Sequence, residues 1–137
     1  MSEPITVSAR IVAEPEVVWS RWTTPADICA WNAASPEWHT PHAESDLREG
    51  GRFTTRMEAR DGSLGFDLTG TWQVVERPHR LVYELADGRR CTITFRPEAG
   101  GTRLTETFDP EGQTPVDLQR AGWQSILDRF KQYVETA

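Results

Sequence analysis

The hydrophobic period of this chain changes near residue 114, and that change constrains the fold more than any other feature. From there to the C-terminus, apolar side chains recur at intervals close to 3.6 residues, at Val116, Trp123, Ile126, Leu127, Phe130 and Val134. The spacing predicts an amphipathic helix of about six turns, roughly 33 Å long. Thr114 is the expected N-cap, with Pro115 in the first helical position. An isolated helix of this length is marginal in water, so its apolar stripe needs a partner surface.

The middle of the chain supplies that surface, because its apolar residues alternate with polar ones. A period of two predicts strands near residues 52–60, 66–74, 81–85, 91–95 and 104–108. Hairpin signals separate several of them, at Asp61-Gly62, Asp87-Gly88 and Gly100-Gly101. Successive hairpins predict an antiparallel meander. Its inner face is the only large apolar partner that the pattern offers the helix.

The N-terminal part adds one strand and two short helices. Apolar residues alternate over residues 5–11, which predicts a strand with one buried face. Pro15 and Pro25 each suit the first position of a short helix. Residues 32–43 are polar and aromatic, and we expect a loop there. No repeat or linker divides the chain, so we expect a single domain over residues 1–137.

Charge and composition exclude several classes of function. The net charge of −6 opposes binding to nucleic acid. No basic amphipathic helix and no apolar stretch of membrane-spanning length is present, and the N-terminus lacks the pattern of a signal peptide. The spacing of Cys29 and Cys91 matches no metal or redox motif. We therefore expect a cytoplasmic protein without metal, cofactor, nucleic-acid or membrane partner.

Several motifs follow the same order as these elements. The most specific is Asp46-Leu47-Arg48-Glu49-Gly50-Gly51, and weaker ones are Thr24-Pro25 with Trp31, Arg80-Leu81-Val82-Tyr83 and Gly122-Trp123. On these motifs the chain resembles the START-like (SRPBCC) superfamily, which includes polyketide cyclase-like proteins. Within that superfamily, it resembles the family named for the C-terminal domain of the activator of heat-shock protein 90 ATPase. The resemblance spans almost the whole chain.

The resemblance implies an α+β helix-grip fold with an internal cavity. In that fold a curved antiparallel sheet wraps around the long C-terminal helix, and two short helices follow the first strand. A sheet that curves around one helix cannot contact it equally along its length, so a gap is expected between them. The family has no shared catalytic residues to transfer. The expected walls, which would serve either as core or as ligand contacts, are Met57, Phe66, Trp72, Tyr83, Phe108, Trp123 and Ile126.

Glu106 is the most informative single residue, because it shares the inward register of Leu104 and Phe108. A buried carboxylate needs hydrogen bonds or a cation, or else it takes up a proton. In either state it is a candidate for orienting a polar group of a ligand, or for acid–base chemistry. The alternatives are a strand bulge or a local ion pair with Arg56 or Arg103. Separately, Asp46 and Arg48 are expected to form a charge-assisted pair that pins the double glycine.

Trp31, Trp38 and the loop between them are candidates for a lid over the cavity mouth. The alternative is that Trp31 packs in the core and Trp38 covers it. His39 and His42 follow directly, as hydrogen-bonding partners for a ligand or as ordinary exposed residues. A metal site is disfavoured because no third ligand has convincing spacing.

Three functions from different classes remain open. The favoured one is a binding or carrier module for a small apolar or aromatic molecule. The second is a cyclase, aromatase or hydrolase that uses the same pocket. The third, implied by the resemblance, is a chaperone-associated stress-response module. The candidate partners are accordingly the small ligand, a chaperone, and a second copy of this chain in a homodimer.

Overall fold

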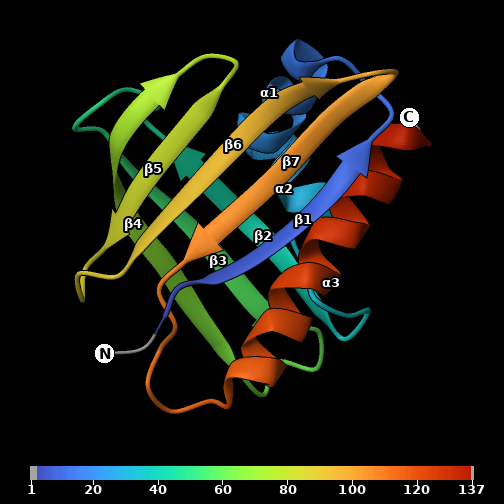
Figure 1. The fold of residues 1–137 in the computed structure, drawn as a ribbon. Coiled ribbons are helices and arrows are strands. Elements are labelled where there is room, and N and C mark those ends of the chain that lie inside the picture. The colour runs from blue at the N-terminus through green and yellow to red at the C-terminus, as the bar shows by residue number, and fades with distance from the viewer. Residues whose placement is uncertain (1–2, 137) are drawn as a thin grey trace.

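The computed structural model describes residues 3–136, in which a seven-stranded antiparallel sheet curls around helices (Figure 1). The strands are β1 Ile5–Ile11, β2 Trp38–Ser45, β3 Arg52–Ala59, β4 Gly65–Glu76, β5 Arg80–Leu85, β6 Arg90–Glu98 and β7 Gly101–Phe108. The helices are α1 Pro15–Thr23, α2 Pro25–Trp31 and α3 Val116–Glu135. The predicted fold class is confirmed, including the two short helices after the first strand and the long helix at the end.

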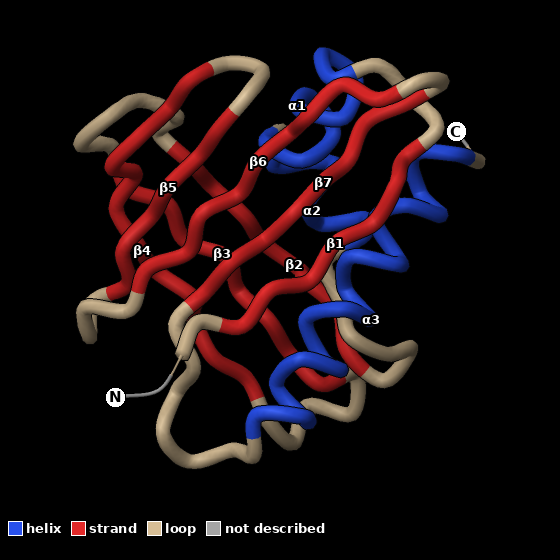
Figure 2. The backbone as a smooth tube through the Cα atoms, in the orientation of Figure 1, coloured by secondary structure: helices blue, strands red, loops and turns tan. Residues whose placement is uncertain are grey.

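The order of strands in the sheet is β1-β7-β6-β5-β4-β3-β2. From β2 to β7, each strand pairs with the next along the chain, as the hairpin signals predict. The first strand instead pairs with the last, with Val7 opposite Glu106. β1 and β2 therefore form the two edges of the sheet. Figure 2 shows α3 running beside β1, and α3 makes its closest sheet contacts with that strand.

The loop predicted for residues 32–43 is wrong from residue 38 onward, because β2 occupies Trp38–Ser45. This strand lies at the sheet edge and pairs with β3 alone, with a register shift between His39 and His42. Pro41 lies at the shift. A proline is tolerated at such an edge, and the irregular register interrupts the period of two. These features concealed the strand in the sequence.

The start of α3 also differs from the prediction. The N-cap is Pro115, not Thr114, and none of the described side chains caps the helix. The loop before the helix is tied to its first turn instead. The Nε2 group of Gln119 donates to the carbonyl oxygens of Glu111 (3.0 Å) and Thr114 (2.7 Å). Among the described residues, no helix is long and apolar enough to cross a membrane.

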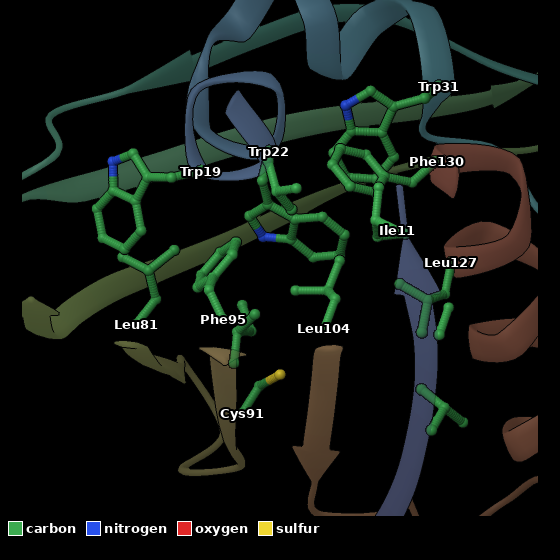
Figure 3. Packing of buried hydrophobic residues seen from close by; sticks show 14 of the residues in the cluster. Ile11, Trp19, Trp22, Trp31, Leu81, Cys91, Phe95, Leu104, Leu127 and Phe130 are labelled. Carbon is green, nitrogen blue, oxygen red and sulfur yellow. The ribbon is translucent and has the colours of Figure 1, made fainter. Parts of the chain in front are cut away.

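The solid part of the core is an aromatic cluster between α1, α2 and α3 (Figure 3). The ring centroids of Trp22 and Trp31 lie 4.7 Å apart, and each lies 4.9 Å from that of Phe130, in edge-on geometry. Trp19 packs on Phe95 of β6 at 5.2 Å. Such aromatic pairs add to the free energy of burial. The cluster therefore fixes the C-terminal half of α3 against both short helices.

The double-glycine motif forms a tight turn between β2 and β3. The Nε group of Arg48 donates to Asp46 Oδ2 at 2.8 Å, which confirms the predicted pair. Two backbone hydrogen bonds of 2.8 Å, from Gly50 N–H to Trp72 C=O and from Trp72 N–H to Gly51 C=O, join the turn to β4. The motif therefore holds the backbone of Trp72 in place.

Replacing Gly51 with alanine is expected to destabilise the fold by about 1–3 kcal/mol. A Cβ atom at this position would overlap the carbonyl oxygen of Asp46, and backbone cannot move aside as a side chain can. The free energy of unfolding, measured by urea denaturation, checks the prediction. The control is Gly112→Ala, where a Cβ atom would meet no atom within 4 Å. Equal stability of the two variants would contradict this account.

Candidate functional site

A cavity of about 400 Å³ lies between the inner face of the sheet and α3. Its volume falls within the range of small-molecule sites, roughly 300–1,000 Å³. The residues that line it come from every strand except β1 and from all three helices, or from the loops beside them: Trp22, Thr23, Ile28, Trp31, Asn32, Glu44, Ser45, Phe53, Thr55, Met57, Phe66, Leu68, Trp72, Tyr83, Leu85, Arg89, Ile93, Glu106, Glu111, Trp123 and Ile126. Most of these side chains are apolar, so the cavity suits an apolar molecule.

The sheet side of the cavity is an aromatic wall on β3, β4 and β5. The ring of Phe53 lies 4.9 Å from Trp72 and 5.0 Å from Tyr83, and the last two are 5.8 Å apart. Trp72 and Tyr83 are cross-strand partners, while Phe53 faces Gly70. A Cβ atom at Gly70 would lie 2.6 Å from the Phe53 ring, so the glycine makes room for it. The Trp72 Nε1 group donates to Ser45 Oγ at 2.9 Å, which fixes the indole.

The helix side of the cavity is formed by Trp123 and Ile126 of α3. Phe108 of β7 stacks on Trp123 with a centroid distance of 3.6 Å and an interplanar angle of 11°. Phe108 therefore lies behind the indole that faces the cavity. Stacking of this kind restricts the Trp123 side chain and keeps the wall in one position.

Glu106 brings a carboxyl group into this apolar surrounding. It points inward from β7 between Leu104 and Phe108, as predicted, and is 4% exposed. None of the described residues donates a hydrogen bond to its carboxyl group, and desolvation by burial raises its pKa from 4.5 to about 8. The alternative of a local ion pair is not realised, since Arg56 pairs with Glu58 and Arg103 with Glu98. At neutral pH Glu106 is therefore mainly protonated.

Two other titratable side chains neighbour Glu106 on the inner face. Burial raises the pKa of Tyr83 and of Cys91 well above their ordinary values. Both groups are consequently neutral near pH 7. A neutral thiol is a poor nucleophile, so Cys91 behaves as a small buried side chain, as expected.

The remaining charges lie around the cavity at Glu44, Arg89 and Glu111. Arg89 is already paired, because its Nε group donates to Asp87 Oδ2 at 2.7 Å. Hydrogen bonds from Thr114 and then Gln113 lower the pKa of Glu111, which is therefore ionised. The electrostatic surrounding of the cavity is thus negative.

Eight of the twelve predicted site residues line the cavity: Trp31, Met57, Phe66, Trp72, Tyr83, Glu106, Trp123 and Ile126. Trp31 belongs at the same time to the aromatic cluster, and its Nε1 group donates to Arg21 C=O at 3.0 Å. The other four are Phe108, described above, and Trp38, His39 and His42 of β2. Trp38 packs edge-on against Phe66 at 6.1 Å.

His39 and His42 belong to a strand, not to the loop predicted there. Their Nε2 atoms lie 3.8 Å from Glu58 Oε1 and 3.7 Å from Glu44 Oε2, respectively. Neither histidine lines the cavity. Within residues 3–136, no three side chains of the metal-binding types lie close enough together to hold an ion.

Sequence reasoning missed several lining residues. Phe53, Thr55 and Leu68 share the period-two faces of Met57 and Phe66, so the same pattern contained the signal for them. Glu44, Arg89 and Glu111 have no such signal, because turns and edges bring them to the cavity.

Comparison with known proteins agrees with this structure. The family described as "Activator of Hsp90 ATPase homolog 1-like protein" matches residues 12–135. The solution structure of the AHSA1-like protein from Aeromonas hydrophila is 50% identical over 97% of this chain and 92% of that one, with a TM-score of 0.91. A protein from Cytophaga hutchinsonii is 44% identical over 98% and 94% of the two chains, with a TM-score of 0.86. A Nitrosomonas europaea protein, 20% identical over 98% and 95%, shares the fold with a TM-score of 0.84. No curated protein matches the sequence.

The raised pKa of Glu106 predicts that stability falls as the pH rises from about 5 to 8. In that range the folded chain holds a proton on Glu106 that the unfolded chain releases, because the folded pKa is about 8 and the ordinary value 4.5. The contribution to the free energy of unfolding therefore decreases by about 1 kcal/mol per pH unit and levels off above the folded pKa.

Urea denaturation of wild type and Glu106→Gln at several pH values checks the predicted decrease in the free energy of unfolding. The amide cannot ionise, so the variant should gain stability relative to wild type as the pH rises. Glu37→Gln, at an exposed position, is the matched control. If the difference in the free energy of unfolding between wild type and Glu106→Gln were the same at every pH, the raised pKa of Glu106 would be refuted.

Proposed function

The chain belongs to the family of Activator of Hsp90 ATPase homolog 1-like proteins, and from this premise we propose that it binds a small apolar or aromatic molecule in its cavity. One observation carries the proposal. A cavity of about 400 Å³ has aromatic walls on both sides and a single buried carboxyl group without a partner among the described residues.

The composition of the walls supports an apolar ligand. Phe53, Trp72 and Tyr83 supply aromatic rings on one side, and Trp123 supplies another on α3. Transfer of an apolar molecule from water into such surroundings is favourable by about 25 cal/mol per Å² of apolar surface buried. Glu106 then supplies a deeply buried carboxyl group, which would fix the orientation of the ligand.

The rigidity of the walls supports binding without large rearrangement. The hydrogen bond from Trp72 to Ser45 and the stacking of Trp123 on Phe108 hold two of the four rings. Side chains that are already ordered lose little conformational entropy when a ligand arrives. The cavity thus has the properties of a preformed binding site.

Catalysis and chaperone association stay predictions. Glu106 is a candidate acid or base, but Tyr83 and Cys91 beside it are neutral, and neither is positioned as an activated nucleophile. Binding requires neither an acid or base nor an activated nucleophile, so it is the function that the geometry supports best.

Filling the cavity is expected to abolish binding. Ile126→Trp places an indole in the space between α3 and the sheet, whereas Leu118→Trp puts the same side chain on a position of α3 that is 63% exposed. The fluorescence of 1-aminoanthracene, a neutral aromatic probe, reports binding. We expect Ile126→Trp to weaken the affinity more than about tenfold, a loss near 1.4 kcal/mol, and Leu118→Trp to leave it unchanged.

Circular dichroism of both variants provides the control for folding. If a folded Ile126→Trp variant bound the probe as tightly as wild type, the cavity would not be the binding site. The proposal would then fail.

A further inference from the structure

Resting on the proposed function, the geometry points to a more specific ligand: we propose that the cavity binds an apolar or aromatic molecule that carries an ammonium group, with Glu106 as its counter-ion. The inference joins three features of the described residues. These are a buried carboxyl group without a partner, the aromatic lining of the same cavity, and the charges around that cavity, which are negative on balance.

The carboxyl group of Glu106 has no cation of its own. The three arginines that would be candidates are each held by another carboxylate. Arg56 Nε lies 2.9 Å from Glu58, Arg103 Nε lies 3.1 Å from Glu98, and Arg89 Nε lies 2.7 Å from Asp87. A buried carboxylate without a partner costs several kcal/mol, and contact with a cation offsets part of that cost.

The aromatic rings that line the same cavity also favour a cation, and Tyr83 is the one whose titration Glu106 affects directly. An ammonium group over the face of a tryptophan, tyrosine or phenylalanine gains about 0.5–2 kcal/mol, the larger value where water is excluded. Phe53, Trp72 and Tyr83 lie within 6 Å of one another, and Trp123 faces them from α3. A positive group inside the cavity would therefore lie in an aromatic lining as well as near the carboxyl group.

The charges around the cavity act in the same direction. Glu44 and Glu111 line it with two negative charges, and Arg89 adds one positive charge that is paired with Asp87 but also acts on Tyr83 and Glu111. The chain as a whole carries a net charge of −6. Such a field attracts cations and opposes anionic ligands such as fatty acids.

Binding of a permanent cation would expel the proton of Glu106. The protonated carboxyl group loses its proton to solvent, and the carboxylate pairs with the ammonium group, so charge and atoms balance. The titratable or charged groups that face Glu106, or that lie around the cavity on the elements packed there, are Tyr83, Cys91, Arg89, Glu44 and Glu111. Tyr83 and Cys91 stay neutral because burial raises their pKa values, so the pH dependence near pH 8 comes mainly from Glu106.

The test compares two probes of the same shape, phenyltrimethylammonium, which is charged at every pH, and tert-butylbenzene, which is neutral. We expect wild type to bind the cation more than about tenfold tighter at pH 8.5 than at pH 6.5, because the site must first lose its proton. Calorimetry at pH 6.5 in two buffers of different ionisation enthalpy should show release of most of one proton. For tert-butylbenzene, the neutral probe, we expect neither the pH dependence of the affinity nor the release of a proton.

Two variants complete the experiment. Glu106→Gln should weaken binding of phenyltrimethylammonium at pH 8.5 by more than about tenfold and leave tert-butylbenzene bound. Glu37→Gln, a matched change at an exposed site away from the cavity, should change neither. If Glu106→Gln does not fold, the pH dependence and proton release of wild type still decide the question.

The outcomes separate the inference from the function on which it rests. Binding of tert-butylbenzene or 1-aminoanthracene without the cation at pH 8.5 would overturn the inference and leave the proposed function standing. Equal affinity of wild type and a folded Glu106→Gln variant for the cation would do the same. If no probe binds at any pH, both the proposed function and this inference are wrong.

Discussion

The packing of Phe130 against the stacked rings of Trp22 and Trp31 is the contact on which the arrangement of this molecule depends. It joins α3 to both short helices, because the Phe130 ring centroid lies 4.9 Å from each indole. Near that contact the space under the helix is full, with Leu127 and Phe130 completely buried. About one turn closer to the N-terminus, Trp123 and Ile126 face a cavity instead. One helix thus closes the core with one half and leaves room for a ligand with the other.

The two halves divide stability from binding. Large buried side chains such as Phe95, Phe130 and Leu104 contribute the hydrophobic free energy that holds the sheet to the helices. The side chains around the cavity give up part of that gain, and Glu106 adds the desolvation of a carboxyl group. The aromatic cluster borders this cavity, because Trp22 and Trp31 belong to both. A protein without a ligand to accommodate would be more stable with the space filled.

Sequence reasoning succeeded where a residue's environment follows from its register. The alternation of Leu104, Glu106 and Phe108 placed the glutamate on the inner face, and the pattern of α3 identified its buried stripe. Sequence reasoning failed where tertiary contacts determine the local structure. β2 looks like a loop because Pro41 and polar residues suit an irregular edge. Thr114 looks like a cap, but Gln119 ties that loop to the helix by other contacts. The cavity itself is beyond the pattern, since it depends on whether a ring such as Phe108 points into space or stacks on Trp123.

Fold and ligand are separable in this architecture. A chain only 20% identical shares the same fold with a TM-score of 0.84, so the fold alone does not determine what the cavity accepts. The chemistry of this cavity depends on its own side chains, among which Glu106 is a deeply buried carboxyl group. Apolar walls accept many molecules of similar size, because each additional methylene changes the binding free energy by only about 1 kcal/mol. A buried carboxyl group discriminates more strongly, since a ligand that leaves it unpaired forgoes a charge-assisted contact worth more than several such groups. Glu106 is consequently the residue on which the proposed chemistry of a ligand rests.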